Sequence, residues 1–319
     1  MEFEPVMSEV VLTCAADERF SLPLAVMLYS AMKNFRGRGG ISIYVVDVGI
    51  SPLSKSRIRR ALRQFPVDLH WLRPPNVETI KNLPTTSHLP LATYYRLFIP
   101  DLLPDIDKAI YLDSDILVEA DLAKLWESNT SDCYLLAALA RKNIIKRRTI
   151  AVCPELEPYL EHEYFNAGVM VMNLARMRED GIFAKAIDFA RKYPECIRAA
   201  DQDLLNAVCV GGWNKIDSCW NWLVKSKDKH KYHFRPNSIL HFVGDRKPWR
   251  PEQARLYQWD DVGITHRRYN RYLVDSGFFS TYERLSHSLR CMYFSSLRCL
   301  RENALARKVL RKVRQVSGI

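Results

Sequence analysis

Three short predicted strands near the start of the chain constrain its fold more than any other feature. Residues 10–15 form an apolar run with β-branched side chains that predicts a buried strand, and residues 41–47 and 67–72 predict a second and a third strand. Between them, residues 21–32 and 51–64 predict helices, because each segment begins with a serine suited to an N-cap and a proline in the first turn. This alternation predicts an α/β fold with a mainly parallel sheet, whose ligands bind beyond the carboxyl ends of its strands.

Length and composition are those of an ordinary globular protein. The chain has 319 residues, of which 48% are hydrophobic and 26% charged, so it can bury a substantial core. Its character changes past about Asp260, where arginines punctuate an apolar series. We therefore predict a main α/β domain over residues 1–260 and a basic, amphipathic helical appendage over residues 261–319.

The cysteines and the N-terminus favour the cytoplasm. The eight cysteines form no Cys-x-x-Cys pair, which argues against a structural zinc site, and their scatter suits a reducing compartment. The first residues lack the apolar core of a secretory signal, and no stretch is long and apolar enough to span a bilayer. We expect a cytoplasmic protein.

An Asp-x-Asp sequence follows a further apolar run, residues 108–112. Alternation along an extended chain would place Asp113 and Asp115 on the same side. Two carboxylates this close repel each other unless a cation joins them, and their oxygens suit Mg²⁺ or Mn²⁺. The same pattern also occurs in turns and helix caps.

His241 is a candidate third metal ligand. It closes a predicted strand at residues 238–240, and Gly244 and Lys247 follow it. A glycine permits close approach of the backbone to a ligand, and a lysine can meet a phosphate. A histidine at a strand end is otherwise often a satisfied core residue.

Six motifs, in this order, resemble those of glycosyltransferase family 8, which includes glycogenin and bacterial lipopolysaccharide galactosyl- and glucosyltransferases. The resemblance extends from about Val10 to Trp249 and is strongest to the bacterial lipooligosaccharide α-galactosyltransferases. The motifs are Ala15-Ala16-Asp17, Thr93-Tyr94-Tyr95-Arg96-Leu97, Tyr111-Leu112-Asp113-Ser114-Asp115, Phe165-Asn166-Ala167-Gly168-Val169, Asp201-Gln202-Asp203 and the run from His241 to Trp249.

The resemblance implies a GT-A fold, which is a single Rossmann-like domain with a mixed sheet. It also implies a UDP-sugar donor, Mn²⁺ and retention of the anomeric configuration. The metal ligands would be Asp113, Asp115 and His241. The residues implied in donor binding are Ala15, Ala16, Asp17 and Phe20 around the uracil, Gly244 and Lys247 at the diphosphate, and His88, Arg96, Ser114, Asn166, Gly168, Asp201 and Gln202 elsewhere in the donor site.

Two positions depart from the family pattern. Arg19 replaces a small amide beside the uracil-binding residues, and Arg141 lies where similar enzymes carry an acidic residue near the acceptor. The sequence therefore leaves the acceptor open, as a glycan or a lipid-linked glycan. It also leaves the donor open between UDP-galactose and UDP-glucose.

The implied catalytic residues are Gln202, Asp201 and Arg96. Retention requires either a nucleophile on the far face of the sugar or attack on the same face as departure. Gln202 is a poor nucleophile, which favours same-face attack. Asp201 is expected both to cap a helix and to orient the donor sugar. Arg96 lies in a predicted helix over residues 93–99, where the alternative is a surface salt bridge.

The net charge of +11 indicates an acidic partner. The basic helical tail suits the inner face of an anionic plasma membrane, or it packs on the catalytic domain with its basic face in water. A sugar nucleotidyltransferase would also use carboxylates and Mg²⁺, but it needs a glycine-rich loop after the first strand. A non-enzymatic nucleic-acid binder is less favoured, because no nucleic-acid motif occurs.

Overall fold

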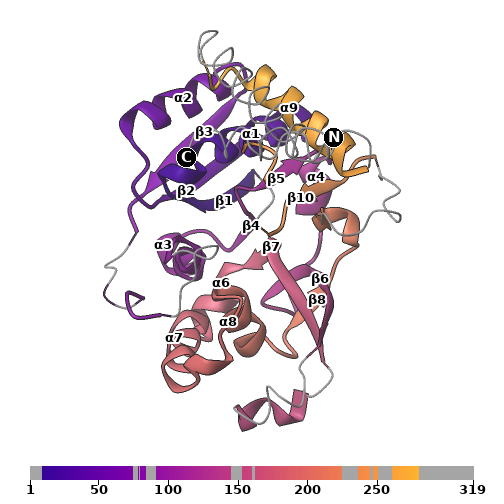
Figure 1. Ribbon diagram of the computed structural model, residues 1–319. Helices are drawn as coiled ribbons and strands as arrows, with labels where there is room; N and C mark the ends of the chain where they lie inside the picture. Colours follow the sequence, from indigo (N-terminus) through magenta and orange to yellow (C-terminus); the bar gives the residue numbers. More distant parts are fainter. Residues whose placement is uncertain are drawn as a thin grey trace, which may run out of the picture.

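The computed structural model describes residues 9–74, 78, 80–83, 91–144, 153–159, 162–224, 236–244, 247–250 and 261–279. Its larger sheet has the strand order β3-β2-β1-β4-β7-β6-β8. Strands β3, β2, β1 and β4 are parallel, whereas β7 is antiparallel to both β4 and β6 (Figure 1). The predicted mixed, mainly parallel sheet is confirmed. Its strands are β1 (Val10–Ala16), β2 (Ile41–Asp47), β3 (Val67–Leu72), β4 (Lys108–Leu112), β6 (Leu135–Ile144), β7 (Glu163–Asn173) and β8 (Trp213–Lys215).

A second, smaller sheet creates the junction at which the candidate site lies. It consists of β5 (Ile116–Val118), β10 (Ile239–His241) and β9 (Trp222–Leu223), with β10 in the middle. Strand β4 ends in the larger sheet and β5 begins in the smaller one, so residues 113–115 cross from one sheet to the other. The crossing lies beside His241, the last residue of β10, because His241 pairs with Ile116.

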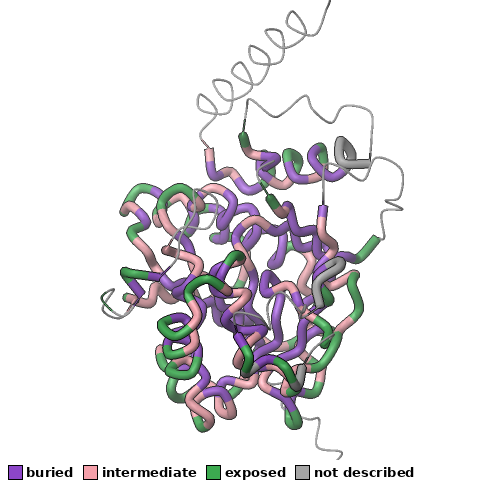
Figure 2. Tube along the Cα trace, turned by 60° about the horizontal axis from the view of Figure 1, so that its bottom comes forward, coloured by how far each residue is buried: buried purple, intermediate pink, exposed green. Residues whose placement is uncertain are grey.

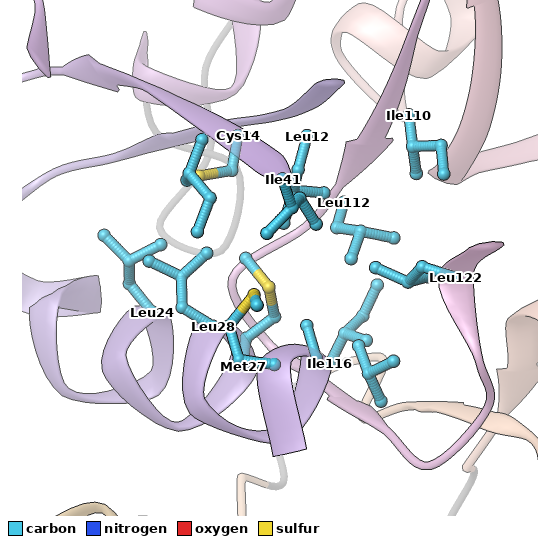
Figure 3. Packing of buried hydrophobic residues seen from close by; sticks show 14 of the residues in the cluster. Leu12, Cys14, Leu24, Met27, Leu28, Ile41, Ile110, Leu112, Ile116 and Leu122 are labelled. Atoms are coloured by element: carbon cyan, nitrogen blue, oxygen red, sulfur yellow. The ribbon is translucent and has the colours of Figure 1, made fainter. Parts of the chain in front are cut away.

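Helices cover both faces of the larger sheet. Figure 3 shows Leu24, Met27 and Leu28 of α1 directed at Leu12 and Cys14 of β1. The opposite face packs against η3, α3, α6, α7 and α8. The helices, with 3₁₀ helices marked η, are η1 (Glu18–Phe20), α1 (Ser21–Asn34), α2 (Pro52–Leu62), η3 (Leu91–Phe98), α3 (Ile99–Leu102), α4 (Leu122–Trp126), η4 (Pro154–Tyr159), α6 (Leu174–Glu179), α7 (Ile182–Lys192), η5 (Pro194–Cys196), α8 (Asp201–Val208), η6 (Ser218–Asn221) and α9 (Asp261–Ser276).

Burial explains why the predictions of strands β1 and β2 were accurate. The tube in Figure 2 is buried through the centre of the molecule, and exposed residues lie mainly toward its periphery. Strands covered on both faces require continuous apolar runs, which are visible in sequence. Strand β2 has the predicted bounds, and β1 is one residue longer than predicted. Strand β3 also has the predicted bounds, although it is an edge strand in which no residue is buried. Helix α2 begins at Pro52 as expected, with Ser51 as its cap, but ends at Leu62, two residues early.

Helix α9 covers the first part of the predicted C-terminal appendage. It packs beside α1 (Figure 1), where Lys33 Nζ lies 2.8 Å from Asp275 Oδ2. Arg268 Nε also donates to the buried Glu119 at 2.9 Å. The remainder of the predicted basic tail, residues 280–319, lies outside the described residues. In the described part of the chain, no helix combines the length and apolarity needed to cross a bilayer.

Candidate active site

The two aspartates lie on a turn that joins the two sheets. The Asp113 amide donates to the Gly168 carbonyl of β7 at 2.8 Å, and the Phe242 amide donates to the Asp115 carbonyl at 3.0 Å. Residues 114 and 115 form a turn, so the predicted alternation along an extended chain is wrong. The carboxylates still converge, because each backbone end of the turn is held by a different sheet.

Asp113, Asp115 and His241 form one cluster. Each offers a ligand atom, and these atoms all lie within 4.8 Å of one another. His241 Nε2 is 3.3 Å from Asp115 Oδ1 and 3.7 Å from Asp113 Oδ2. Two carboxylate oxygens and an imidazole nitrogen are ligands that suit a divalent metal ion. The sequence prediction of this grouping agrees with the geometry.

Each carboxylate has one oxygen engaged outside the cluster and one directed into it. Asp113 Oδ1 lies 2.9 Å from an Arg96 terminal nitrogen and accepts from the Tyr111 hydroxyl at 3.0 Å, which leaves Oδ2 toward His241. Asp115 Oδ2 accepts from Lys247 Nζ at 2.5 Å, which leaves Oδ1 toward His241. Partners of this kind orient the ligands of metal sites, so the residues present fit a divalent cation.

The electrostatics of the cluster favour a cation. Burial alone would raise the pKa of Asp115, but Lys247 and His241 outweigh it and hold that pKa well below its usual range. Burial raises the pKa of Asp201 to about 6, although Arg96 opposes the shift. With Asp201 ionised and His241 neutral, as a metal ligand has to be, three carboxylates face the cationic side chains of Arg96 and Lys247. One uncompensated negative charge then remains for a metal to neutralise.

Gly168 gives the cluster its space. A Cβ built at this position would lie 2.2 Å from His241 Cε1, 2.6 Å from His241 Nδ1 and 2.9 Å from Asp113 Oδ2. Side chains cannot approach this closely, so only glycine permits β7 to run beside these two ligands. Steric crowding by His241 and Asp113 therefore explains why this chain has glycine at position 168 of the family motif.

Arg96 is a buried residue of the site rather than part of a surface salt bridge. It is 6% exposed and binds Asp113, with its Nε 2.6 Å from Asp201 Oδ2 and another nitrogen donating to the Ala167 carbonyl at 2.7 Å. Its segment is the 3₁₀ helix η3, not the predicted helix over residues 93–99. Pro100 has no amide hydrogen to donate to the carbonyl of Arg96, which denies the segment one α-helical bond.

The expectation that Asp201 caps a helix is wrong. Ala200 holds the cap position of α8 with φ 50°, and Asp201 is the first helical residue. Asp203 instead accepts the free amides of Arg198 and Ala199, each at 2.6 Å. An uncompensated Arg96 in the interior would cost more than the ~1 kcal/mol of a side-chain cap. The pairing with Arg96 therefore decides where the Asp201 carboxylate lies.

Asn166 and Gln202 lie together beside the cluster. Asn166 Nδ2 donates to Gln202 Oε1 at 2.9 Å, and the same oxygen accepts the Ala167 amide at 3.2 Å. Sequence reasoning missed Asn221, which lies 2.9 Å from His241 Nδ1 and donates to Asn166 Oδ1 at 2.7 Å. No local pattern marks Asn221, because it reaches the site only through the packing of η6.

The residues implied in uracil binding gather at the end of β1. Ser114 Oγ donates to the Ala15 carbonyl at 3.3 Å, which ties the turn to β1 just before Ala16. Asp17 caps η1 by accepting the Phe20 amide at 3.2 Å, and Arg19 pairs with Asp17.

The structure describes only some of the remaining residues that the resemblance places in the donor site. The Phe20 ring lies 6.1 Å, centroid to centroid, from that of Trp249, two residues past Lys247. Gly244 has φ 79°, a conformation that glycine adopts freely. His88 and the side chain of Arg141 lie outside the described residues.

Comparison with known proteins identifies the relatives of the chain. The model of the family described as "Glycosyl transferase family 8" matches residues 11–253. General stress protein A of Bacillus subtilis is 29% identical over 265 residues, which is 78% of this chain and 90% of that protein. A putative glycosyltransferase of Haemophilus influenzae is 31% identical over 252 residues, covering 76% and 73%. The lipopolysaccharide 1,3-galactosyltransferase of Salmonella typhimurium is 28% identical over 187 residues, covering 54% and 53%.

A solved structure shares the fold. The structure of the galactosyltransferase LgtC with donor and acceptor sugar analogs superposes with a TM-score of 0.72 at 23% identity. The match covers 86% of this chain and 99% of that one. The likeness confirms the GT-A fold that the sequence resemblance implies.

Proposed function

Because the chain belongs to glycosyl transferase family 8, we propose that it is a retaining, Mn²⁺-dependent hexosyltransferase that takes galactose or glucose from a UDP-sugar. One observation carries the proposal: Asp113, Asp115 and His241 converge with their ligand atoms within 4.8 Å. They would hold the ion, which supplies a Lewis acid for the departing diphosphate. Lys247, whose ammonium lies at the edge of this cluster, adds a positive charge on the same side.

The donor-binding residues fit this chemistry. Ala15, Ala16, Asp17 and Phe20 bind the uridine in the proposed complex, and His88 and Gly244 complete the contacts with the donor. Asn166, Asp201 and Gln202 border the metal cluster, where the donor sugar would lie. Arg96 fixes Asp113 and Asp201 at once, since it pairs with both.

Gln202 is held too firmly to act as a mobile nucleophile. Its Oε1 accepts two hydrogen bonds, and its Nε2 donates to the Tyr164 hydroxyl at 3.1 Å. An amide is a weak nucleophile, and both ends of this one are engaged. These contacts support same-face attack, in which the leaving phosphate accepts the proton of the acceptor hydroxyl.

We propose a glycan or a lipid-linked glycan of the cell surface as the acceptor. The support is the name of a relative, the lipopolysaccharide 1,3-galactosyltransferase. The reaction would take place in the cytoplasm, with the basic region after residue 260 contacting the inner face of the plasma membrane. The division into a catalytic domain and a C-terminal basic region belongs to the same proposal.

Replacing Asp115 by alanine is expected to abolish metal-dependent transfer, whereas Gln202→Ala keeps measurable activity. Asp115 supplies a metal oxygen and Gln202 a neutral contact. The measurement is the steady-state release of UDP with added Mn²⁺. Asp115→Asn, which preserves the shape of the side chain, separates lost coordination from lost folding. Full activity in a folded Asp115 variant would end the metal proposal.

A panel of UDP-sugars, assayed for UDP release with and without Mn²⁺, tests the proposed reaction. We expect release from UDP-galactose or UDP-glucose only when the metal is present. Release of pyrophosphate from UTP and a sugar phosphate would instead establish a nucleotidyltransferase. Release that is unaffected by removal of the metal would contradict the proposal.

A further inference from the structure

A continuous series of side-chain hydrogen bonds leads from His241 to Asp203. The series passes through Asn221, Asn166, Gln202 and Tyr164, and joins β10, η6, β7 and α8. Its heavy-atom distances, in that order, are 2.9, 2.7, 2.9, 3.1 and 2.5 Å. The series begins at a proposed metal ligand and ends at a carboxylate that the proposed reaction does not use.

Backbone amides fix the orientation of each side-chain amide in the series. The Gly168 N–H donates to Asn166 Oδ1 at 3.0 Å, and the Ala167 N–H donates to Gln202 Oε1 at 3.2 Å. A backbone N–H is always a donor, so neither amide can exchange its oxygen and nitrogen. Asn221 must then present its NH₂ to Asn166 and its oxygen to His241.

This orientation determines which imidazole nitrogen binds a metal. Asn221 Oδ1 can only accept, so His241 Nδ1 carries a hydrogen and donates it. Nε2 is then the nitrogen with a free lone pair, and it is the one that faces Asp113 and Asp115. A partner on the far ring nitrogen fixes the tautomer of a metal-binding histidine in this way.

The far end of the series is a firmly held negative charge. Asp203 Oδ2 accepts the amides of Arg198 and Ala199, and Oδ1 accepts from Tyr164. Burial, with Asp203 beside it, raises the pKa of the Tyr164 phenol well above its usual range, so the phenol remains a donor. Every bond therefore points from His241 toward Asp203, and bonds aligned in one direction polarise one another.

We propose that Asn221, Tyr164 and Asp203 are positioning residues that set the tautomer and raise the basicity of His241 as a metal ligand. The inference rests on the metal site of the proposed function and deepens it. It assigns a role to three residues to which the proposed function gives none. It also makes the helix that carries Gln202 part of the support of the metal site.

The experiment measures Mn²⁺ dissociation constants in the absence of any sugar nucleotide, by electron paramagnetic resonance of free Mn²⁺. Asn221→Leu removes the acceptor from His241 and is expected to weaken Mn²⁺ binding ~10- to 100-fold. Tyr164→Phe leaves every amide in place and removes only the link to Asp203. We expect a smaller loss, about threefold or more, through reduced polarisation of the amides.

Two further measurements separate tuning from loss of structure. Tyr134→Phe is the matched control for Tyr164→Phe, because the Tyr134 hydroxyl donates to Asp180 at 2.8 Å outside the series. We expect it to leave the Mn²⁺ dissociation constant unchanged. Nitrogen-15 chemical shifts of the His241 ring report the tautomer directly, and we expect the ring proton on Nδ1 in the wild-type protein.

The outcomes distinguish this inference from the function on which it rests. Suppose that the wild-type protein binds Mn²⁺ with the same dissociation constant as the folded variants Asn221→Leu and Tyr164→Phe. In that case the inference about the positioning residues is wrong, but the proposed metal site is still supported. A wild-type protein with the ring proton of His241 on Nε2 would also overturn the tautomer argument. A wild-type protein that does not bind Mn²⁺ would overturn both.

Discussion

Replacing Gly168 by alanine is expected to lower Mn²⁺-dependent transfer at least ~100-fold, the scale of loss that follows a displacement of about 1 Å in catalytic groups. The added methyl group would overlap the His241 ring and crowd Asp113 Oδ2. Neither the His241 ring nor strand β7 can move away easily. The ring is held by Asn221, and β7 is held at this point by the bond between the Asp113 amide and the Gly168 carbonyl. Steady-state UDP release and the Mn²⁺ dissociation constant would both report the loss.

Gly212→Ala provides a matched control for crowding itself. A Cβ at Gly212 would lie 2.7 Å from two ring atoms of Tyr134, so this substitution also introduces a clash, but away from the metal cluster. We expect it to reduce thermal stability without changing the Mn²⁺ dissociation constant. A folded Gly168→Ala protein with undiminished Mn²⁺ affinity would show that His241 does not ligate the metal from this position.

Replacing Arg96 by methionine is expected to cost roughly 3–5 kcal/mol in the free energy of unfolding, because removal of one partner leaves buried charges uncompensated. Arg96 pairs with both Asp113 and Asp201, and the carboxyl of Asp201 is 2% exposed. Urea unfolding would measure the change. Arg191→Met is the control, since Arg191 forms an exposed pair with Asp188, and such pairs contribute about 0–1 kcal/mol.

The loss of unfolding free energy caused by Arg96→Met should depend on pH. Burial raises the folded-state pKa of Asp201 to about 6, above its ordinary value of 3.8, even with Arg96 present. The protonated form is therefore favoured by folding, and this contribution to stability is present below about pH 4 and is lost as pH rises through the folded pKa. Without Arg96 that pKa rises further. We expect a smaller deficit at pH 5 than at pH 8, and an equal deficit at both would contradict the role of Arg96.

The parts of the fold that could be predicted from sequence are those in which a short run of neighbouring residues already shows that the segment is buried. Strand β3 was placed correctly although it is an edge strand with no buried residue. Strand β2 was placed correctly because buried parallel strands need unbroken apolar runs. Likewise, Asp113 and Asp115 were visible as carboxylates that follow such a run. His241, 126 residues beyond Asp115 in the sequence, was a candidate from its place at a strand end before Gly244 and Lys247, and the family resemblance assigned it to the same metal site.

The parts that could not be predicted depend on contacts between distant segments. The cap of α8 was misassigned because the position of Asp201 is decided by Arg96, which lies on another element. The turn at Asp113–Asp115 was mistaken for an extended strand because nothing local shows that the chain changes sheets there. Asn221 was missed for the same reason, since its partners His241 and Asn166 come from two other strands.

The most direct test of the metal-dependent mechanism is anomalous diffraction from crystals grown with Mn²⁺ and UDP. We expect one manganese peak within bonding distance of Asp113, Asp115 and His241 Nε2, with a diphosphate oxygen among its ligands. A manganese peak elsewhere, or UDP bound with no metal at these three side chains, would contradict it.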